Sequence, residues 1–360
     1  MKNSYLTAGI RLSGLFRLLR RNTLSFHPKY LLRIFFLAQS ALWSSFFSRI
    51  EDARYRKKIR SSPLPGRILF IIGHWRSGST FLHQLLSRDP GFACPTLFQV
   101  AIPDSFITSY RYYRPLMSVL ISRHRPMDNV RLGMNEPQED EYAIYRITDY
   151  SPLEKLVFPG KPVFFLSEVE SYTPGNGKFP EWENKVKDYF RKLHFHTGKD
   201  IISKNPFNSM RIRELQAMFP EARFIHIHRH PYEVIPSTIH MWSIVQQQNC
   251  LNRNAHCPEL SEILKVYDRI MTKIRLDLDR LEPARVFEIG YEELVGNPAN
   301  AIDRIYRHFG LNYTPEFGAR LQGTLGELRN YRKNEFCLKE EEKEQIRKWL
   351  GHHMDYYGYC

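Results

Sequence analysis

The chain has 360 residues, of which 42% are hydrophobic and 25% are charged, and this is an ordinary globular composition. That composition excludes collagen, coiled-coil and wholly disordered proteins, and no run of about 18 uncharged apolar residues points to a polytopic membrane protein. The net charge of +14 is unevenly placed, because residues 1–60 hold 13 Lys and Arg and only two acidic residues, whereas the rest of the chain carries +3. The globular body is therefore nearly neutral, which argues against a nucleic-acid partner.

Residues 1–60 are expected to form a basic helical extension. An apolar run, Ile34–Phe47, lies between two groups of basic residues. Its 14 uncharged residues are too few to cross a hydrocarbon layer of about 30 Å at 1.5 Å per residue. Basic residues on both flanks fit a signal peptide poorly. Two interpretations stay open: an amphipathic helix in the interface of an anionic membrane, or a helix pair that packs on the rest of the chain with its basic face in water.

The five cysteines give little reason to expect disulfides. Their number is odd, no Cys-x-x-Cys pair occurs, and a chain of this size rarely depends on a disulfide framework. Free thiols are the expectation, with a Cys250–Cys257 pair across a loop as the alternative. This usage favours a cytoplasmic protein, which under the membrane interpretation is peripheral on the cytoplasmic face.

Residues 61–360 are expected to form one α/β domain. Ser61–Gly66 is rich in Ser and Pro and indicates a linker. Short apolar runs then alternate with helical patterns, which predicts a central parallel sheet flanked by helices in a three-layer, P-loop-like fold. We expect strands at Arg67–Ile72, near Ile201, at Arg223–His228 and at Arg285–Ile289, and helices before Pro220, at Ser261–Leu281 and from an Asn297 N-cap to Gly310.

The loop after the first strand has the spacing of a phosphate-binding loop, G-x4-G-x-[ST]. Two glycines let the backbone turn so that its N–H groups face an anion at the start of the next helix. A nucleoside-triphosphate P-loop has Lys where this chain has Ser79, and here the cation lies within the loop as Arg76. No strand ends in an Asp suited to Mg²⁺. The sequence therefore predicts a phosphate site that does not take ATP, formed by Gly73, Arg76, Ser77, Gly78, Ser79 and Thr80.

The segment Arg76–Thr80, directly after a strand, resembles the 5′-phosphosulfate loop of sulfotransferases that use PAPS (3′-phosphoadenosine 5′-phosphosulfate). A second segment supports the resemblance, because Arg229 ends a strand and Ser237 follows eight residues later, as in the family's 3′-phosphate segment. One guanidinium and one hydroxyl suit a phosphate dianion. The chain is thus similar to bacterial-type sulfotransferases, which are related to tyrosylprotein sulfotransferases.

Three further segments extend the resemblance to roughly residues 65–350. Lys204–Phe207 is similar to the Lys-Asp-Pro-Phe segment of tyrosylprotein sulfotransferases, and Tyr291–Leu294 to a Tyr-Glu-x-Leu turn that borders the adenine pocket. In related enzymes a basic segment near the C-terminus closes over the 3′-phosphate, which implies a cofactor contact for Lys333. A solvated charge run is the alternative for that residue.

The resemblance implies in-line transfer of a sulfuryl group from PAPS to a hydroxyl or amine of an unidentified acceptor, without a metal. It implies that Arg76 and Lys204 neutralise phosphate oxygens as the leaving group forms. The Glu that serves as base in tyrosylprotein sulfotransferases has no counterpart here. Glu139 and Glu141 lie in a Pro-x-Glu-Asp-Glu segment that recurs in bacterial-type members and are the candidates for the base, with an ordinary acidic helix start as the alternative.

Other functions remain open at this level. His226, His228 and His230 alternate along one strand face, but Cys or Asp partners at zinc-ligand spacing are missing, so we expect them to line the cofactor cleft or to pack against a helix. A P-loop kinase-like nucleotide-binding protein and a catalytically silent, membrane-docked binding protein are the two competing functions. The apolar, basic N-terminus favours a hydrophobic or lipid-linked acceptor.

Overall fold

The computed structural model divides into two compact units. The first unit contains residues 1–65, 95–198 and 241–258, and the second contains residues 66–94, 199–240 and 259–360. The structure describes residues 6–22, 28–120, 133–148, 151–158, 179–251, 258–328 and 336–359. The residues expected to form an N-terminal extension therefore fall in one unit with later parts of the chain.

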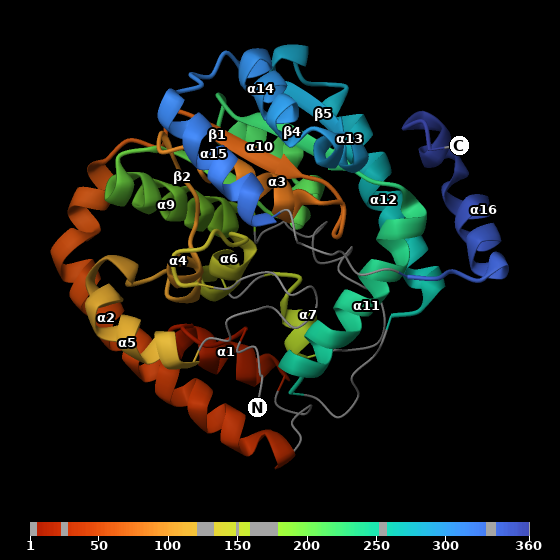
Figure 1. The fold of residues 1–360 in the computed structure, drawn as a ribbon. Helices are drawn as coiled ribbons and strands as arrows, with labels where there is room; N and C mark the ends of the chain where they lie inside the picture. Colours follow the sequence, from red (N-terminus) through yellow and green to blue (C-terminus); the bar gives the residue numbers. More distant parts are fainter. Residues whose placement is uncertain are drawn as a thin grey trace. The chain divides into compact units, whose positions relative to one another are not determined.

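The second unit is built on a five-stranded parallel sheet with the strand order β2-β3-β1-β4-β5. Figure 1 labels β1, β2, β4 and β5 of this sheet. Its strands are β1 (Ile68–Ile72), β2 (Phe92–Ala93), β3 (Asp200–Lys204), β4 (Arg223–His228) and β5 (Val286–Gly290). All five residues of β1 are buried, as in a strand covered on both faces. The four predicted strands are confirmed. The two residues of β2 are too few to show a periodic pattern, so the sequence does not predict this strand.

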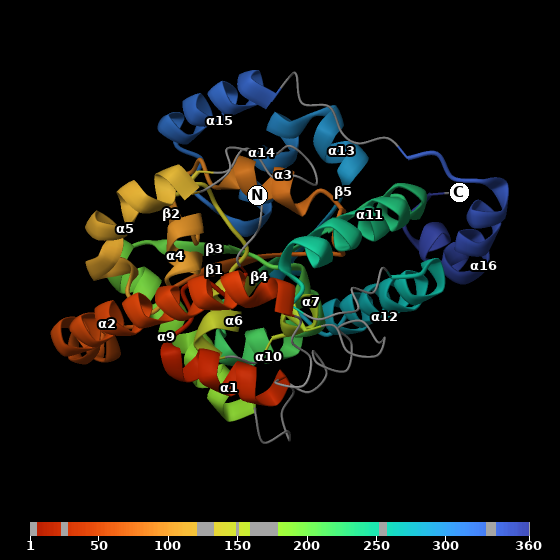
Figure 2. The ribbon, with the colours of Figure 1, turned by 90° about the horizontal axis from the view of Figure 1, so that it is seen from below.

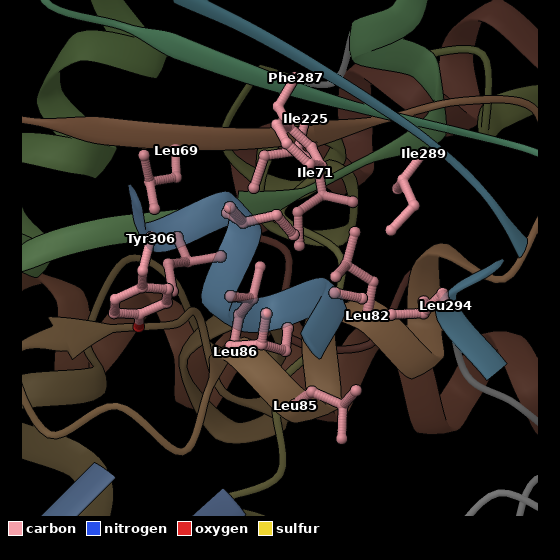
Figure 3. Packing of buried hydrophobic residues seen from close by; sticks show 14 of the residues in the cluster. Leu69, Ile71, Leu82, Leu85, Leu86, Ile225, Phe287, Ile289, Leu294 and Tyr306 are labelled. Carbon is pink, nitrogen blue, oxygen red and sulfur yellow. The ribbon is translucent and has the colours of Figure 1, made fainter. Parts of the chain in front are cut away.

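Helices cover both faces of this sheet. One face packs on α3 (Ser79–Leu86), α14 (Pro298–Phe309) and α15 (Pro315–Leu328), with Leu69 and Ile225 of the sheet meeting Leu82 and Tyr306 of the helices (Figure 3). The alternate side chains point to the other face, where the rings of Phe70 and Phe224 stack with their centroids 5.5 Å apart. Phe70 also contacts Phe219 at the end of α10 (Ile212–Met218), so the predicted three-layer fold is confirmed.

Local sequence signals set the ends of α14. The Asn297 side chain accepts a hydrogen bond from the Asn300 backbone N–H at 3.1 Å, Pro298 follows it, and Gly310 ends the helix with φ of 59°. Both predicted caps are confirmed.

The other elements of the second unit are η3 (Pro206–Met210), α12 (Leu260–Leu278), η4 (Pro283–Arg285), α13 (Tyr291–Gly296) and α16 (Glu340–Tyr356). Helix α11 (Pro231–Asn249) begins in the second unit and ends in the first.

The described part of the first unit is helical. Its elements are α1 (Leu12–Asn22), η2 (Pro28–Tyr30), α2 (Leu31–Ser61), α4 (Leu97–Ala101), α5 (Phe106–Leu120), α6 (Glu141–Thr148), α7 (Glu154–Val157) and α9 (Phe179–Thr197). Helix α2 contacts α1, α5 and α9, and Figure 2 shows its long axis beside α1.

Helix α2 is much longer than the apolar run that predicted it. It has 31 residues and is the one helix in the described ranges that is long and apolar enough, by length and composition, to cross a membrane. Only 22% of its most apolar window is buried.

Among the cysteines, Cys94, Cys250 and Cys337 are free thiols, and Cys257 and Cys360 lie outside the described residues.

Candidate active site

The loop between β1 and α3 depends on left-handed backbone conformations. Gly73 has a φ of 144° and Gly78 a φ of 97°. A Cβ on Gly73 would lie 2.3 Å from the Ile227 carbonyl oxygen, and one on Gly78 would lie 2.2 Å from the Tyr291 ring, so neither position accepts a side chain. Arg76, with φ of 69°, is the one non-glycine residue of positive φ in the described part of the chain. Such a backbone costs about 1–3 kcal/mol and persists where the surroundings fix it.

Arg76 is fixed by a residue 161 positions further along the chain. Its Nε donates a hydrogen bond to Ser237 Oγ at 2.8 Å. Ser237 is buried on the first half of α11, the helix that follows β4. The loop and the helix that the family resemblance assigned to two different phosphates of PAPS therefore meet at this hydrogen bond.

Arg229 joins the same cluster from the end of β4. It is 8% exposed, and its Cζ lies 4.3 Å from the centroid of the Tyr291 ring. Its Nη2 contacts Glu233 Oε2 at 2.6 Å, and its Nη1 lies 3.5 Å from the Arg76 carbonyl oxygen. Tyr291 thus packs under the Arg229 guanidinium and against Gly78. Sequence-predicted residues from three separate segments come together in this unit.

Two buried donors in this cluster have no hydrogen-bond partner among the described residues, namely Ser77 Oγ and Arg229 Nε. Leaving such donors unpaired costs about 1–3 kcal/mol each, and oxygens of bound phosphate groups would satisfy them. Helix α3 begins at Ser79, so its first backbone N–H groups and the positive end of its dipole lie directly after Ser77. The residues present therefore fit a ligand that carries phosphate groups.

Lys204 and His83 lie beside this loop. Lys204 ends β3, is paired with Ile71 of β1, and is only 3% exposed. Burial, together with the Lys204 charge, lowers the pKa of the fully buried His83 to about 3, so this imidazole is neutral at pH 7. His83 is not predictable from the sequence, because one His among apolar helix residues gives no signal of its own. Its place next to Lys204 becomes visible only in the fold.

The acidic candidates lie in the first unit. Glu141 begins α6, is fully buried, and accepts a hydrogen bond from Ser151 Oγ at 2.5 Å. Glu139 precedes the helix and is half-buried. Asp140 between them is also fully buried, and its backbone carbonyl accepts from the N–H groups of Ala143 and Ile144. The helix therefore begins at Glu141, two residues after Glu139. Lys333, the remaining predicted cofactor contact, lies outside the described residues.

The alternating histidines of β4 contact the last residues of the chain. His226 Nδ1 lies 2.7 Å from Glu288 Oε2, and His228 Nδ1 lies 2.7 Å from the Tyr359 hydroxyl. The His228 ring also stacks on Tyr357, with centroids 4.2 Å apart. Burial and the neighbouring His226 lower the pKa of His228 to about 3. Carboxylate and aromatic partners therefore account for these two histidines.

Another group of side chains in the second unit has the composition of a metal site. The ligand atoms of Asp268, His352 and His353 lie within 4.8 Å of one another. Nε2 of His352 and Nε2 of His353 lie 3.1 and 3.0 Å from the same Asp268 oxygen. The His353 contact is a hydrogen bond, and the His352 contact is within ion-pair distance of the same carboxylate, so both join α12 to α16.

A parallel sheet whose first strand leads into a loop with P-loop spacing, with a second guanidinium at the end of the neighbouring strand, defines a P-loop-like α/β fold. The chain matches the sulfotransferase family model over residues 69–315, more than half of its length, and it belongs to that family. It is a sulfotransferase that moves a sulfuryl group from PAPS, the donor that is standard in the family, to an acceptor.

Relatives of known sequence and structure agree with this assignment. The chain is 29% identical over 355 residues to the omega-hydroxy-beta-dihydromenaquinone-9 sulfotransferase Stf3 of Mycobacterium bovis, which covers 98% of this chain and 91% of that protein. The Mycobacterium tuberculosis Stf3 matches equally well. The crystal structure of STF9 from Mycobacterium avium superposes with a TM-score of 0.68 at 18% identity, covering 99% of this chain and 92% of that one, and this shows the shared fold.

Proposed function

We propose that Arg76, Lys204 and the amides of the loop carry the catalytic charge stabilisation. In the reaction, the acceptor oxygen or nitrogen bonds to sulfur as the bond from sulfur to the bridging oxygen of the 5′-phosphate breaks, and the acceptor proton passes to a base. Arg76 and Lys204 offset the negative charge that grows on the leaving 5′-phosphate. The Ser79 and Thr80 hydroxyls hold that phosphate in line.

Arg229 and Ser237 are proposed to hold the 3′-phosphate, and Tyr291 to border the adenine. The observation that carries this proposal is the joined cluster of Arg76, Ser237, Arg229 and Tyr291, in which the Arg229 Nε donor is buried and lacks a partner among the described residues. Arg229 pairs with the Glu233 carboxylate through Nη2, which leaves its Nε for the phosphate. Lys333 stays a proposed contact of the same phosphate.

The general base is proposed to be a carboxylate of the acidic segment, Glu139 or Glu141. Ser151 already occupies one oxygen of the buried Glu141, whereas Glu139 is half-buried and is the more accessible of the two. We therefore assign proton abstraction to Glu139 and give Glu141 a positioning role at the start of α6. No metal is required in this scheme, because two cations of the chain serve the leaving group.

The acceptor is proposed to be a hydrophobic or lipid-linked molecule with a free hydroxyl. The name of the Mycobacterium bovis relative gives a hydroxylated menaquinone derivative as its substrate, and the exposed apolar side chains of α2 suit a cytoplasmic enzyme in peripheral contact with the membrane. Incubation of the enzyme with labelled PAPS and either an organic-solvent extract or an aqueous extract of cells tests this class. Label that enters only water-soluble products would contradict the proposal.

Isothermal titration with 3′,5′-adenosine bisphosphate, beside ATP with Mg²⁺, tests the cofactor site. We expect micromolar binding of the bisphosphate, about −8 kcal/mol, and none of ATP. Arg229→Ala should abolish binding, whereas Arg280→Ala, a change at an exposed arginine in the same unit, should leave it unchanged. Binding of ATP alone would point to the kinase-like alternative, and binding of neither nucleotide to a catalytically silent protein.

A further inference from the structure

Helix α2 has its large apolar side chains on the outside. The stripe that faces inward consists of Leu37, Ala41, Ser44, Ser48 and Glu51, which are at most 4% exposed. The opposite stripe, called here the outer face, consists of Leu32, Phe35, Trp43 and Phe46, which are 79%, 65%, 56% and 54% exposed. A helix that serves only to pack on a protein core carries its large apolar residues inward. In α2 the inward stripe has one large apolar residue and three polar ones, whereas all four residues of the outer face are large and apolar.

Specific contacts fix the inner face to the protein. Ser44 Oγ donates to the Gly9 carbonyl at 2.6 Å, and the Gly9 N–H donates to Ser40 Oγ at 3.0 Å. Nearer the C-terminal end of the helix, the buried Glu51 carboxylate forms an ion pair with Lys192 and accepts from the Thr108 N–H at 2.7 Å. The outward direction of the apolar side chains is therefore set by hydrogen bonds and an ion pair on the other side.

Aromatic and basic side chains extend the outer face. Phe46 and Trp43 contact each other and Phe47, which stacks on the exposed Tyr112 of α5 with centroids 5.3 Å apart. Exposed basic side chains follow along α2 at Arg49, Arg54, Arg56, Lys57, Lys58 and Arg60. Helices that lie in the headgroup region of a bilayer typically combine Trp and Tyr with Lys and Arg.

We infer that the outer face of α2 is a docking surface for an anionic lipid bilayer, with the helix lying in the plane of the membrane. The charge of residues 1–60 distinguishes two occupants of this surface, a lipid bilayer and a second copy of the chain. Residues 1–60 carry 13 basic and two acidic residues, so two copies repel each other through this segment, whereas anionic headgroups attract it. The inner contacts decide against a spanning helix, because spanning would place Ser44 and its partners in hydrocarbon.

This inference rests on the peripheral membrane contact proposed above and is tested without substrate, so its failure is distinguishable from failure of the sulfotransferase site. The full-length protein is sedimented with phosphatidylcholine vesicles, with and without phosphatidylglycerol. We expect binding to the anionic vesicles that weakens at high salt and is released by alkaline carbonate. Leu32→Ser/Phe35→Ser/Trp43→Ser should lower the partition coefficient at least about tenfold, since three large apolar side chains are lost.

The matched control is Leu276→Ser/Trp349→Ser, which removes exposed apolar side chains that are 53% and 42% exposed in the second unit and should leave vesicle binding unchanged. Arg54→Glu/Lys57→Glu should weaken binding to anionic vesicles alone. Circular dichroism melting of each variant verifies its fold. Wild-type protein that binds no vesicles, a triple variant that binds like wild type, membranes that retain the protein in carbonate, or loss of a dimer in the triple variant would each overturn the inference.

Brominated lipids give an independent measurement. Quenching of tryptophan fluorescence should occur in the wild type and fall in Trp43→Phe, although both proteins sediment equally. Equal quenching in the two proteins would contradict placement of Trp43 in the bilayer.

Discussion

The Arg76 guanidinium donates its Nε hydrogen to Ser237, and it does so from a left-handed backbone position. The serine therefore helps to keep a strained arginine in one orientation, in addition to any contact of its own with a phosphate. Ser237→Ala should weaken binding of 3′,5′-adenosine bisphosphate about tenfold, the worth of one hydrogen bond to a charged group. Titration calorimetry measures the change. Thr238→Ala, a neighbouring substitution on the same helix whose hydroxyl bonds to the Val234 carbonyl, is the control.

Arg76 itself should matter for turnover more than for folding. Arg76→Ala removes a charge from the leaving group and should lower kcat by about 100- to 1000-fold. Alanine tolerates the left-handed backbone conformation at position 76 no better than arginine does, so the backbone strain stays the same. A urea midpoint close to that of the wild type, together with the loss in kcat, is the expected pattern. Unchanged turnover would exclude the assigned role.

Gly78→Ala and Gly326→Ala are a matched pair of substitutions. Gly78→Ala places a Cβ 2.2 Å from Tyr291 at a φ of 97°, so we expect loss of nucleotide binding and a destabilised protein. Gly326→Ala, on α15 with no atom within 4 Å of the added Cβ, should stabilise the helix by about 0.5–1 kcal/mol. Urea denaturation measures both changes. Normal nucleotide affinity in Gly78→Ala would show that the loop does not need its close approach to Tyr291.

The acidic segment is tested by conservative amides. Glu139→Gln should lower kcat by about 100-fold or more while the affinity for 3′,5′-adenosine bisphosphate stays the same, because a base acts on the acceptor and not on the nucleotide. Glu141→Gln should instead change stability, since the buried carboxylate accepts the Ser151 hydroxyl. Glu136→Gln is the control nearby. A Glu139→Gln enzyme with full activity would move the base elsewhere.

Two fully buried histidines should make the protein sensitive to acid. Burial lowers the pKa of His74 to about 4, and burial with the Lys204 charge lowers that of His83 to about 3, whereas an unfolded histidine titrates near 6.5. The unfolded chain therefore binds more protons below pH 6.5, and the free energy of unfolding falls by about 1.4 kcal/mol per pH unit for each site as pH decreases toward those values.

The variant that checks this prediction is His83→Gln. Between pH 7 and pH 5 it should lose about 2 kcal/mol less unfolding free energy than the wild type, by urea titration at each pH. Replacement of the exposed His308 by Gln should leave the pH dependence as it is. If the unfolding free energy of His83→Gln fell with decreasing pH as steeply as that of the wild type, the His83 imidazole would not be held neutral.

The Glu51–Lys192 ion pair is expected to attach α2 firmly to α9. Both side chains are buried, so Glu51→Gln leaves a buried, uncompensated ammonium and should cost about 3 kcal/mol. The double change Glu51→Leu/Lys192→Met should recover much of this loss. The exposed pair of Glu340 and Lys343 gives the comparison, because Glu340→Gln should cost much less stability than Glu51→Gln. Equal costs for the two single changes would argue against a buried anchor.

Much of the second unit was predictable from local patterns. Continuous apolar runs gave the four longer strands, and Asn297 and Gly310 gave both ends of α14, because each signal acts within a few residues. The cluster of Arg76, Ser237, Arg229 and Tyr291 was predictable only through the resemblance to sulfotransferases, since nothing local brings positions 161 residues apart together.

Other features could not be predicted, for physical reasons. Ser44 of the apolar run Ile34–Phe47 faces inward and bonds to Gly9, and this contact depends on the packing of α1, which the run itself does not reveal. His83 and Lys204 come from separate segments that only the sheet brings together. The division into two units was equally hidden, because residues 95–198 interrupt the second unit without a compositional boundary.

The register of the sheet has a consequence for synthesis. Ile68 of β1 pairs with Ile201 of β3, and Leu69 pairs with Arg223 of β4. During translation at about 5–20 residues per second, β1 waits on the order of ten seconds before either neighbour has been made. A strand that is apolar on both faces is exposed to other chains throughout that interval. Production in cells should therefore respond to slower growth, lower temperature or added chaperones more strongly than the stability of the finished fold suggests.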